Sequence, residues 1–223
     1  MNWVLANLDL IASLTAAHLR QSAVPIAVGA ALSIPLGWLA YRYRPTQSLL
    51  LTTAGLLYTI PSLALFAILP PLLGLPFLSQ VNLIIALTIY AVAIMTRFAA
   101  DAFGSVAPSA RQAARAIGYG PWQQFWRVEL PLAGPVLIAG LRVTAVSTIS
   151  LATVGVLIGI DNLGYLFTNG YQREILASVL AGVVATVVIA LVVDVLIQLA
   201  GRFLMPWNTS TAAHTPATKR ARR

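Results

Sequence analysis

The sequence predicts an all-α integral membrane protein with about five transmembrane helices and a folded cytoplasmic loop between two of them. Hydrophobic residues make up 59% of the 223-residue chain, charged residues make up only 9%, and the mean hydropathy is +0.84. These values lie outside the range of soluble globular domains. Charged residues are absent from four stretches, each long enough for the roughly 18 residues that a spanning helix needs: 21–41, 46–96, 143–160 and 175–193.

The five spans follow from these stretches in chain order. The stretch 46–96 is too long for one crossing, and Pro70, Pro71, Gly74 and Pro76 in its middle are typical of a turn. We therefore expect two helices joined by a short loop there. The predicted spans are 22–41, 48–70, 81–98, 136–158 and 175–203.

The chain is expected to have three regions. Residues 1–20, whose leucines are unevenly spaced among polar residues, predict a short interfacial helix on the outer side of the membrane. Residues 21–205 are expected to form the transmembrane domain, with the cytoplasmic loop at 99–135. Residues 206–223 are polar and basic, which predicts a disordered tail that contacts anionic lipid.

The basic residues predict the orientation, because Lys and Arg in short loops stay on the cytoplasmic side. If the first loop between spans is inside, only Arg20 and Arg173 of the 14 basic residues lie outside. We therefore expect the N-terminus outside and the C-terminus in the cytoplasm. This distribution also accounts for the net charge of +8, so the charge gives no reason to expect a nucleic-acid partner.

The cytoplasmic loop predicts two short helices separated by a turn. A start signal at 108–109 and a stop signal at Gly118 predict a helix over 109–117, with Arg111 and Arg115 together on one side. A small apolar face lies on another side: Ala110, Ala113, Ala114 and Ile117. A bulkier stripe follows: Trp122, Phe125, Trp126 and Leu130. Such a helix suits docking against another protein; the alternative is a surface loop whose tryptophans lie at the membrane interface.

The same loop resembles the cytoplasmic signature of ABC importer permeases: E-A-A, three residues, G, nine residues, I-x-L-P. Gln112, in place of Glu, and Val128, in place of Ile, are the two departures. The resemblance implies a type I ABC importer permease fold in which this loop is coupled to a separate ATPase, and in which Pro131 ends the second short helix before the fourth span. The implied coupling residues are Gln112, Ala113, Ala114, Arg115, Gly118, Val128, Leu130 and Pro131.

Two further stretches resemble the osmoprotectant branch of these permeases, to which the methionine importers are related. The stretch 58–74, YTIPSLALFAILPPLLG, is similar to the second-span signature T-I-P-S-L-A-L, and Pro61 is expected to kink a helix that lines the translocation path. The stretch 158–170, IGIDNLGYLFTNG, is similar to a glycine-rich motif of the branch. Asp161 and Asn162 stand where glycines are usual, and both tolerate a left-handed backbone. The implied path residues are Tyr58, Thr59, Pro61, Ser62 and Asn162.

The resemblance also implies the partners and the location. A second permease subunit, identical or different, would complete the channel in a bacterial inner membrane, with cytoplasmic ATPase subunits and an external solute-binding protein. No P-loop GxxxxGK[ST] occurs in the chain, so ATP and Mg²⁺ would be bound by the ATPase and no cofactor is expected here. The chain has no cysteine and only two histidines, so neither thiol chemistry nor a metal site is expected.

The expected function is therefore import of compatible solutes such as glycine betaine, choline, carnitine or proline betaine. Import of methionine or another amino acid is the first alternative. A secondary transporter or channel is the second; that class usually shows internal repeats or buried charges along an ion path. A membrane enzyme is disfavoured because no paired carboxylates or nucleophile–base set lies near the spans.

Asp194 is an acid inside the last predicted span. Acids within a membrane are candidates for a proton or substrate role. The alternative is a local pair with Gln198 or Arg202 near the cytoplasmic end of the helix.

Overall fold

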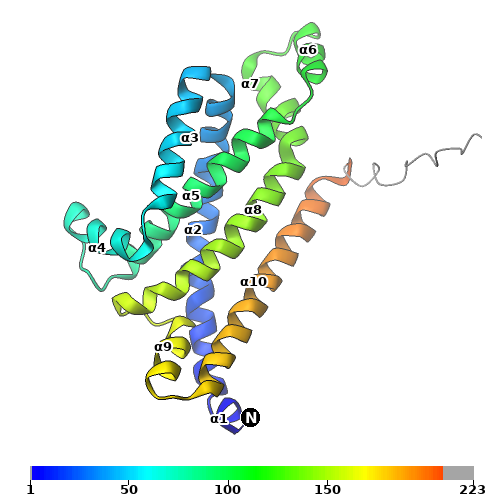
Figure 1. The fold of residues 1–223 in the computed structure, drawn as a ribbon. Helices are drawn as coiled ribbons and strands as arrows, with labels where there is room; N and C mark the ends of the chain where they lie inside the picture. Colours follow the sequence, from blue (N-terminus) through cyan, green and yellow to red (C-terminus); the bar gives the residue numbers. More distant parts are fainter. Residues whose placement is uncertain (1, 208–223) are drawn as a thin grey trace, which may run out of the picture.

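A computed structural model of the chain describes residues 2–207, which form a long helical bundle (Figure 1). The described residues contain four long apolar helices and one bent helix pair, so the predicted all-α architecture with about five spans is confirmed. The spanning elements are α2 (Leu8–Arg42), α3 (Arg44–Thr59) with α4 (Ser62–Leu73), α5 (Gln80–Gly104), α8 (Leu130–Ala152) and α10 (Leu176–Leu204). Of the expected tail 206–223, the structure describes only residues 206 and 207, and the remainder lies outside the described residues.

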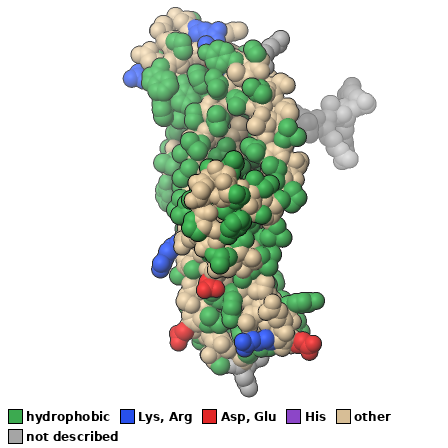
Figure 2. Space-filling model, turned by 90° about the vertical axis from the view of Figure 1, so that its left-hand side faces the viewer, with side chains coloured by type: hydrophobic (Ala, Val, Ile, Leu, Met, Phe, Trp, Pro, Cys, Tyr) green, Lys and Arg blue, Asp and Glu red, His purple; other side chains and the backbone are tan. Residues whose placement is uncertain are grey.

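The two ends of the bundle differ in the elements that they carry. The short helices α6 (Pro108–Ala116) and α7 (Pro121–Gln124) lie at one end, and α1 (Asn2–Ala6) and α9 (Gly164–Gln172) lie at the other (Figure 1). Figure 2 shows that green hydrophobic side chains are spread over the length of the bundle. The acidic side chains visible on that face all lie in its lower part, toward the end that carries α1 and α9.

The first span is longer than expected. The prediction of a separate interfacial helix over 1–20 is wrong, because α2 continues without a break from Leu8 to Arg42. Contacts with the fourth span and with the turn after it hold its N-terminal half: the His18 Nε2 lies 2.9 Å from the Ile149 carbonyl oxygen, and Gln21 Nε2 donates to the Asp161 carbonyl at 3.0 Å. At about 1.5 Å per residue, such a helix exceeds the roughly 30 Å of a bilayer core.

Small residues on α2 allow it to pack closely against α5. Gly29, Ser33 and Gly37 recur every fourth residue, a spacing that lets membrane helices approach each other. A Cβ atom added to Gly37 would lie only 2.3 Å from the Ala99 Cβ atom, and one added to Gly29 would lie 2.6 Å from the Ala91 Cβ atom. The two helices are therefore in contact over two turns of their length.

The second span is broken rather than kinked. The prediction of one helix over 48–70 is wrong, because α3 ends at Thr59 and α4 starts at Ser62 with its axis turned by 105°. Proline disfavours a helical conformation in the residue before it, and Ile60 is extended (φ −65°, ψ 127°). The Tyr90 hydroxyl of α5 donates to the Ile60 carbonyl, so a side chain from a neighbouring span satisfies the interrupted backbone.

The turn after the fourth span is built differently from the expectation. No left-handed residue occurs at 161 or 162; among the described residues, Gly159 (φ 74°) and Glu174 (φ 56°) have positive φ in this region. Asn162 instead acts through its side chain, which is fully buried. It donates to the Ala152 carbonyl at 2.8 Å and accepts from the Gly164 N–H at 2.8 Å, so it joins the end of α8 to the start of α9.

The last span is tied to the fourth by an ion pair. The Arg142 guanidinium of α8 donates two hydrogen bonds of 2.7 Å to the two carboxylate oxygens of Asp194 on α10. The expectation that Asp194 pairs locally with Gln198 or Arg202 is therefore wrong. A sequence pattern on one helix cannot show an arginine that another helix places opposite the acid.

We predict that Gly37→Ala lowers the stability of the purified protein, because its Cβ atom would overlap the backbone and side chain of α5. Overpacking of this kind costs about 1–3 kcal/mol. The measurement is thermal unfolding in detergent. Gly104→Ala is the matched control, since its Cβ atom would meet only a Tyr41 ring carbon at 3.9 Å. Equal melting temperatures for the two variants would contradict the close contact.

Candidate functional site

The helix α6 (Pro108–Ala116) lies in the loop between α5 and α8, within one residue of the predicted bounds. Gly118 ends it as expected, with a left-handed φ of 87°. The Gly118 N–H donates to the Arg115 carbonyl and the Tyr119 N–H to the Ala114 carbonyl, both at 3.0 Å. This pair of hydrogen bonds is the Schellman ending, which glycine allows without strain.

Arg111 anchors this helix to the transmembrane bundle. Its side chain is buried, and its Nη1 donates to the Val106 carbonyl at 2.6 Å while its Nη2 donates to the Phe103 carbonyl. Both carbonyls lie at or just beyond the end of α5, where a helix leaves backbone acceptors unpaired. The guanidinium also stacks over the Tyr41 ring of α2, 4.5 Å from its centroid.

Glu129 supplies the charge that pairs with Arg111. Its Oε1 accepts from Arg111 Nε at 3.0 Å and from Gln124 Nε2 at 2.8 Å, and its Oε2 accepts from Trp38 Nε1 at 2.7 Å. The carboxylate is 3% exposed, so a buried cation and a buried anion are paired and hydrogen-bonded. This network joins α6, the segment after it and α2 into one unit.

The chain enters the fourth span through a wider helical turn. Phe125–Glu129 form a π-helical segment in which the Leu130 N–H donates to the Phe125 carbonyl, and α8 follows directly. The expectation that Pro131 interrupts the helix before the span is wrong. Pro131 has no N–H to donate, and in a regular α-helix its ring would clash with the carbonyl four residues back. The wider π turn before it accommodates this residue, so the helix continues into the span.

The predicted coupling residues divide into an exposed group and an anchoring group. Gln112, Ala113, Arg115 and Gly118 are exposed, and Ile117 is exposed to 70%. Ala114 is buried, and the other three are half-buried: Val128, Leu130 and Pro131. The alanines do not share one face of α6, and the two arginines do not share another, as the periodicity predicted. Ala114 and Arg111 are both buried, whereas Ala113 and Arg115 are both exposed.

The aromatic stripe closes the base of the loop. Trp122 and Trp126 both contact the Phe125 ring, and Phe125 in turn meets Trp38 of α2 edge-on with centroids 5.2 Å apart. Together with α2 they line an apolar groove of about 550 Å³. Trp122 and Trp126 remain more than half exposed.

The predicted path residues lie away from the loop. Tyr58 and Thr59 end α3 and are exposed, Pro61 stands at the break, and Ser62 starts α4. The structure therefore brings these four together. Asn162 is not among them, since it is sealed inside the bundle beside α8 and α9.

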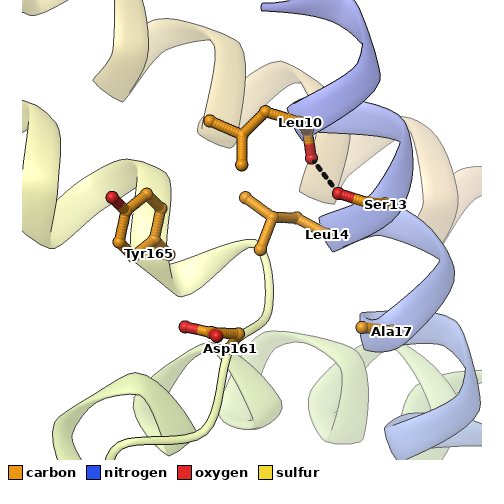
Figure 3. Close-up of a pocket in the computed structure, with 6 residues that line it drawn as sticks. All are labelled: Leu10, Ser13, Leu14, Ala17, Asp161 and Tyr165. Carbon is orange, nitrogen blue, oxygen red and sulfur yellow. Dashed lines mark hydrogen bonds between the residues drawn. The ribbon is translucent and has the colours of Figure 1, made fainter.

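A further cavity of about 450 Å³ opens at the end of the bundle that carries α1 and α9. In Figure 3, Tyr165 of α9 and Asp161 face the first turns of α2, where Ser13 donates to the Leu10 carbonyl at 2.9 Å. This cavity lies at the opposite end of the bundle from α6 (Figure 1).

Sequence reasoning missed Arg111 and Glu129 as a pair, together with Trp38 and Gln124. Two usable signals were present. Arg111 precedes the small Ala114 by three residues, so both lie on one side of the helix. Glu129 is also an isolated acid beside an apolar span, where a charge needs a partner. The identity of that partner depends on how the loop folds back.

These features define a multi-pass membrane component that carries, at one end of the bundle, a short helix held rigidly by Arg111 and Glu129. The chain belongs to the family of binding-protein-dependent transport system inner membrane components, whose model matches residues 29–205. The predicted family is thereby confirmed. The chain is thus a transport component of the inner membrane.

Curated relatives and solved structures agree with this assignment. The chain is 33% identical to the osmoprotectant import permease protein OsmW of Salmonella typhimurium, over 81% of this chain and 86% of the relative. It is 32% identical to the glycine betaine/carnitine/choline permease protein OpuCB of Bacillus subtilis, over 73% and 75%. The fold is similar to a structure of the MetNI methionine ABC transporter in an inward-facing conformation, with a TM-score of 0.73, 21% identity and coverage of 89% and 96%.

We predict that Glu129→Gln loosens the loop, because it leaves the Arg111 guanidinium buried without a counter-charge. Breaking a buried ion pair costs about 3–5 kcal/mol. Trypsin should then cleave after Arg115 faster than in the unaltered protein, as followed by gel electrophoresis. Gln112→Ala is the control, because the Gln112 side chain is exposed and makes no hydrogen bond in the described structure. If both variants were cleaved at the same rate, Glu129 would not be the anchor.

Proposed function

We propose that this chain is the permease subunit of an ATP-driven importer of osmoprotectants such as glycine betaine, choline, carnitine and proline betaine. The observation that carries the proposal is α6, a short helix that is exposed on one side and fixed to three segments of the bundle on the other. The substrate class is supported by the curated relatives, whose names specify osmoprotectants, choline, carnitine and glycine betaine.

The coupling step depends on how α6 is held. Arg111 connects the helix to the end of α5, and Glu129 connects it to α2 through Trp38. A partner ATPase that binds α6 and moves when it hydrolyses ATP would therefore displace α2 and α5 with it. ATP and Mg²⁺ belong to that partner in this proposal, and this chain carries no catalytic step. A differential affinity of the partner for two arrangements of the spans is what would shift their populations.

In this proposal the two ends of the bundle contact different partner proteins. The end with α6 and α7 faces the cytoplasm and its ATPase subunits, and the end with α1 and α9 faces an external solute-binding protein. A second permease subunit, identical or different, completes the translocation path, and lipid surrounds the remaining apolar surface. The arginine distribution supports this orientation, with the N-terminus outside and the C-terminus inside.

We predict that Ala113→Arg abolishes ATPase docking without unfolding the permease. Ala113 is exposed on α6, so a long charged side chain there would prevent close approach of another surface. The measurement is copurification of the ATPase with the tagged permease, alongside size-exclusion chromatography of the permease. Gln172→Arg, an exposed position at the opposite end of the bundle, is the control. Equal ATPase recovery for both variants would overturn the assignment of α6.

We also predict that Gly118→Asp reduces ATP-dependent solute uptake by the assembled transporter. The left-handed φ of Gly118 costs a residue with a side chain about 1 kcal/mol or more, which would distort the end of the docking helix. Full ATP-dependent uptake by this variant would contradict the coupling role.

The substrate class is tested through the complete transporter. Calorimetry of the cognate binding protein with glycine betaine, choline, carnitine and methionine should show binding of quaternary ammonium solutes and none of methionine. Uptake by proteoliposomes that contain permease, ATPase and binding protein should follow the same order. Methionine binding and uptake without any response to the other solutes would replace the proposed substrate class.

A further inference from the structure

A groove of about 410 Å³ lies on the face that α3, α5 and α8 share. Small residues on α3 and α5 leave space for this groove: Ala54, Gly55 and Ala93. A pocket of this volume lies within the range of sites that hold small molecules. It also adjoins Tyr58, at the end of the helix whose break at Pro61 separates α3 from α4.

Arg97 brings an unusual charge into this groove. Of the arginines on or near the spans, Arg111 has Glu129 and Arg142 has Asp194. Arg97 is exposed, and within residues 2–207 no carboxylate oxygen lies within 4.0 Å of its guanidinium. Asp101, one turn further along α5, is also outside this distance. The cation thus lies on a span without a counter-charge from the described part of the chain.

The guanidinium has space around it on the groove side. A Cβ atom added to Gly55 would lie 3.6 Å from Arg97 Nη2, an ordinary contact, so α3 passes beside the charge without covering it. Arg97 lies seven residues before the end of α5 at Gly104, about 10 Å at the usual helical rise. A charge on an apolar span is unfavourable unless something anionic or water reaches it.

An aromatic ring and a hydroxyl group line the same groove. Tyr58 is 52% exposed, and its ring is held edge-on against Tyr90 with centroids 6.2 Å apart. Ser147 of α8 lines the opposite wall. An exposed tyrosine ring attracts a quaternary ammonium group by cation–π interaction, and arginine pairs with a carboxylate through two hydrogen bonds.

We propose that this groove is a solute subsite for zwitterions, in which Arg97 binds the carboxylate and Tyr58 contacts the quaternary ammonium group. This inference rests on the proposed function, because it assumes that osmoprotectants cross the membrane through this chain. It narrows the substrate class to solutes that carry both a carboxylate and a quaternary ammonium group. Glycine betaine and carnitine carry both groups, whereas choline has no carboxylate and meets a repelling cation at Arg97. The groove therefore favours zwitterions over choline, independently of the external binding protein.

The first test compares solutes in proteoliposomes that contain the complete transporter. Arg97→Gln should lower glycine betaine uptake by about tenfold or more, the loss expected for charge-assisted hydrogen bonds, and should leave choline uptake unchanged or raised. Tyr58→Leu should lower uptake of both solutes, whereas Tyr58→Phe should retain it. Arg202→Gln, an exposed arginine at the end of α10, is the control. Equal loss of betaine and choline uptake in Arg97→Gln would overturn the proposal.

The second test does not require transport. The chain has no cysteine, so Ser147→Cys introduces one thiol into the groove. An anionic methanethiosulfonate reagent should modify it faster than a cationic one, and this preference should disappear when Arg97→Gln is added. Millimolar glycine betaine should slow the modification and choline should not. A thiol that neither reagent reaches, as when lipid or the second permease fills the groove, would overturn the subsite.

The two tests separate the proposals from each other. If the transporter moved no quaternary ammonium solute, the proposed function would fail, and the thiol experiment would still decide whether Arg97 attracts an anion into the groove. If uptake were normal and betaine did not protect the thiol, the subsite would fail and the proposed function would stand. Protection by inorganic phosphate alone would assign the groove to a phosphate group, as in a lipid headgroup.

Discussion

The buried pair between Arg111 and Glu129 is the interaction on which the end of the bundle that carries α6 and α7 depends. The π-helical turn that contains Glu129 leads into α8, Arg111 lies on α6, and the remaining hydrogen bonds reach α2 and the end of α5. A short helix of nine residues is not stable alone in water. Its position relative to the spans is therefore set by this pair, which makes α6 a rigid extension of the bundle.

The pair also explains why a glutamine at position 112 is compatible with a structured loop. Gln112 stands where the ABC permease signature has an acid, and its side chain is exposed. The negative charge that holds the loop inside this chain comes from Glu129 instead. Position 112 therefore lies on the outer surface of α6, where its side chain is not needed for the fold of the loop.

The spans and the loop helix were predictable because each depends on local signals: charge-free length, and a proline start with a glycine stop. Three features were not. The effect of a proline depended on its surroundings, since Pro61 separates two helices at 105° while Pro131 is absorbed by a π turn. The partners of Asp194 and Glu129 come from other helices, and Asn162 acts through its side chain and not through a left-handed backbone. Each depends on tertiary contacts that periodicity does not encode.

The arginines on or near the spans differ in whether their charge is paired inside the protein or is available to bind a solute. A guanidinium that leaves water must recover its lost hydration from a carboxylate or from backbone carbonyls. Arg111 and Arg142 recover it within the chain, and neither has a reason to attract a solute. Among the residues that the structure describes, no carboxylate lies within 4.0 Å of Arg97, which lines a groove that also contains the exposed Tyr58. The same physical requirement that makes Arg111 and Arg142 structural leaves Arg97 to be satisfied by something that enters the groove.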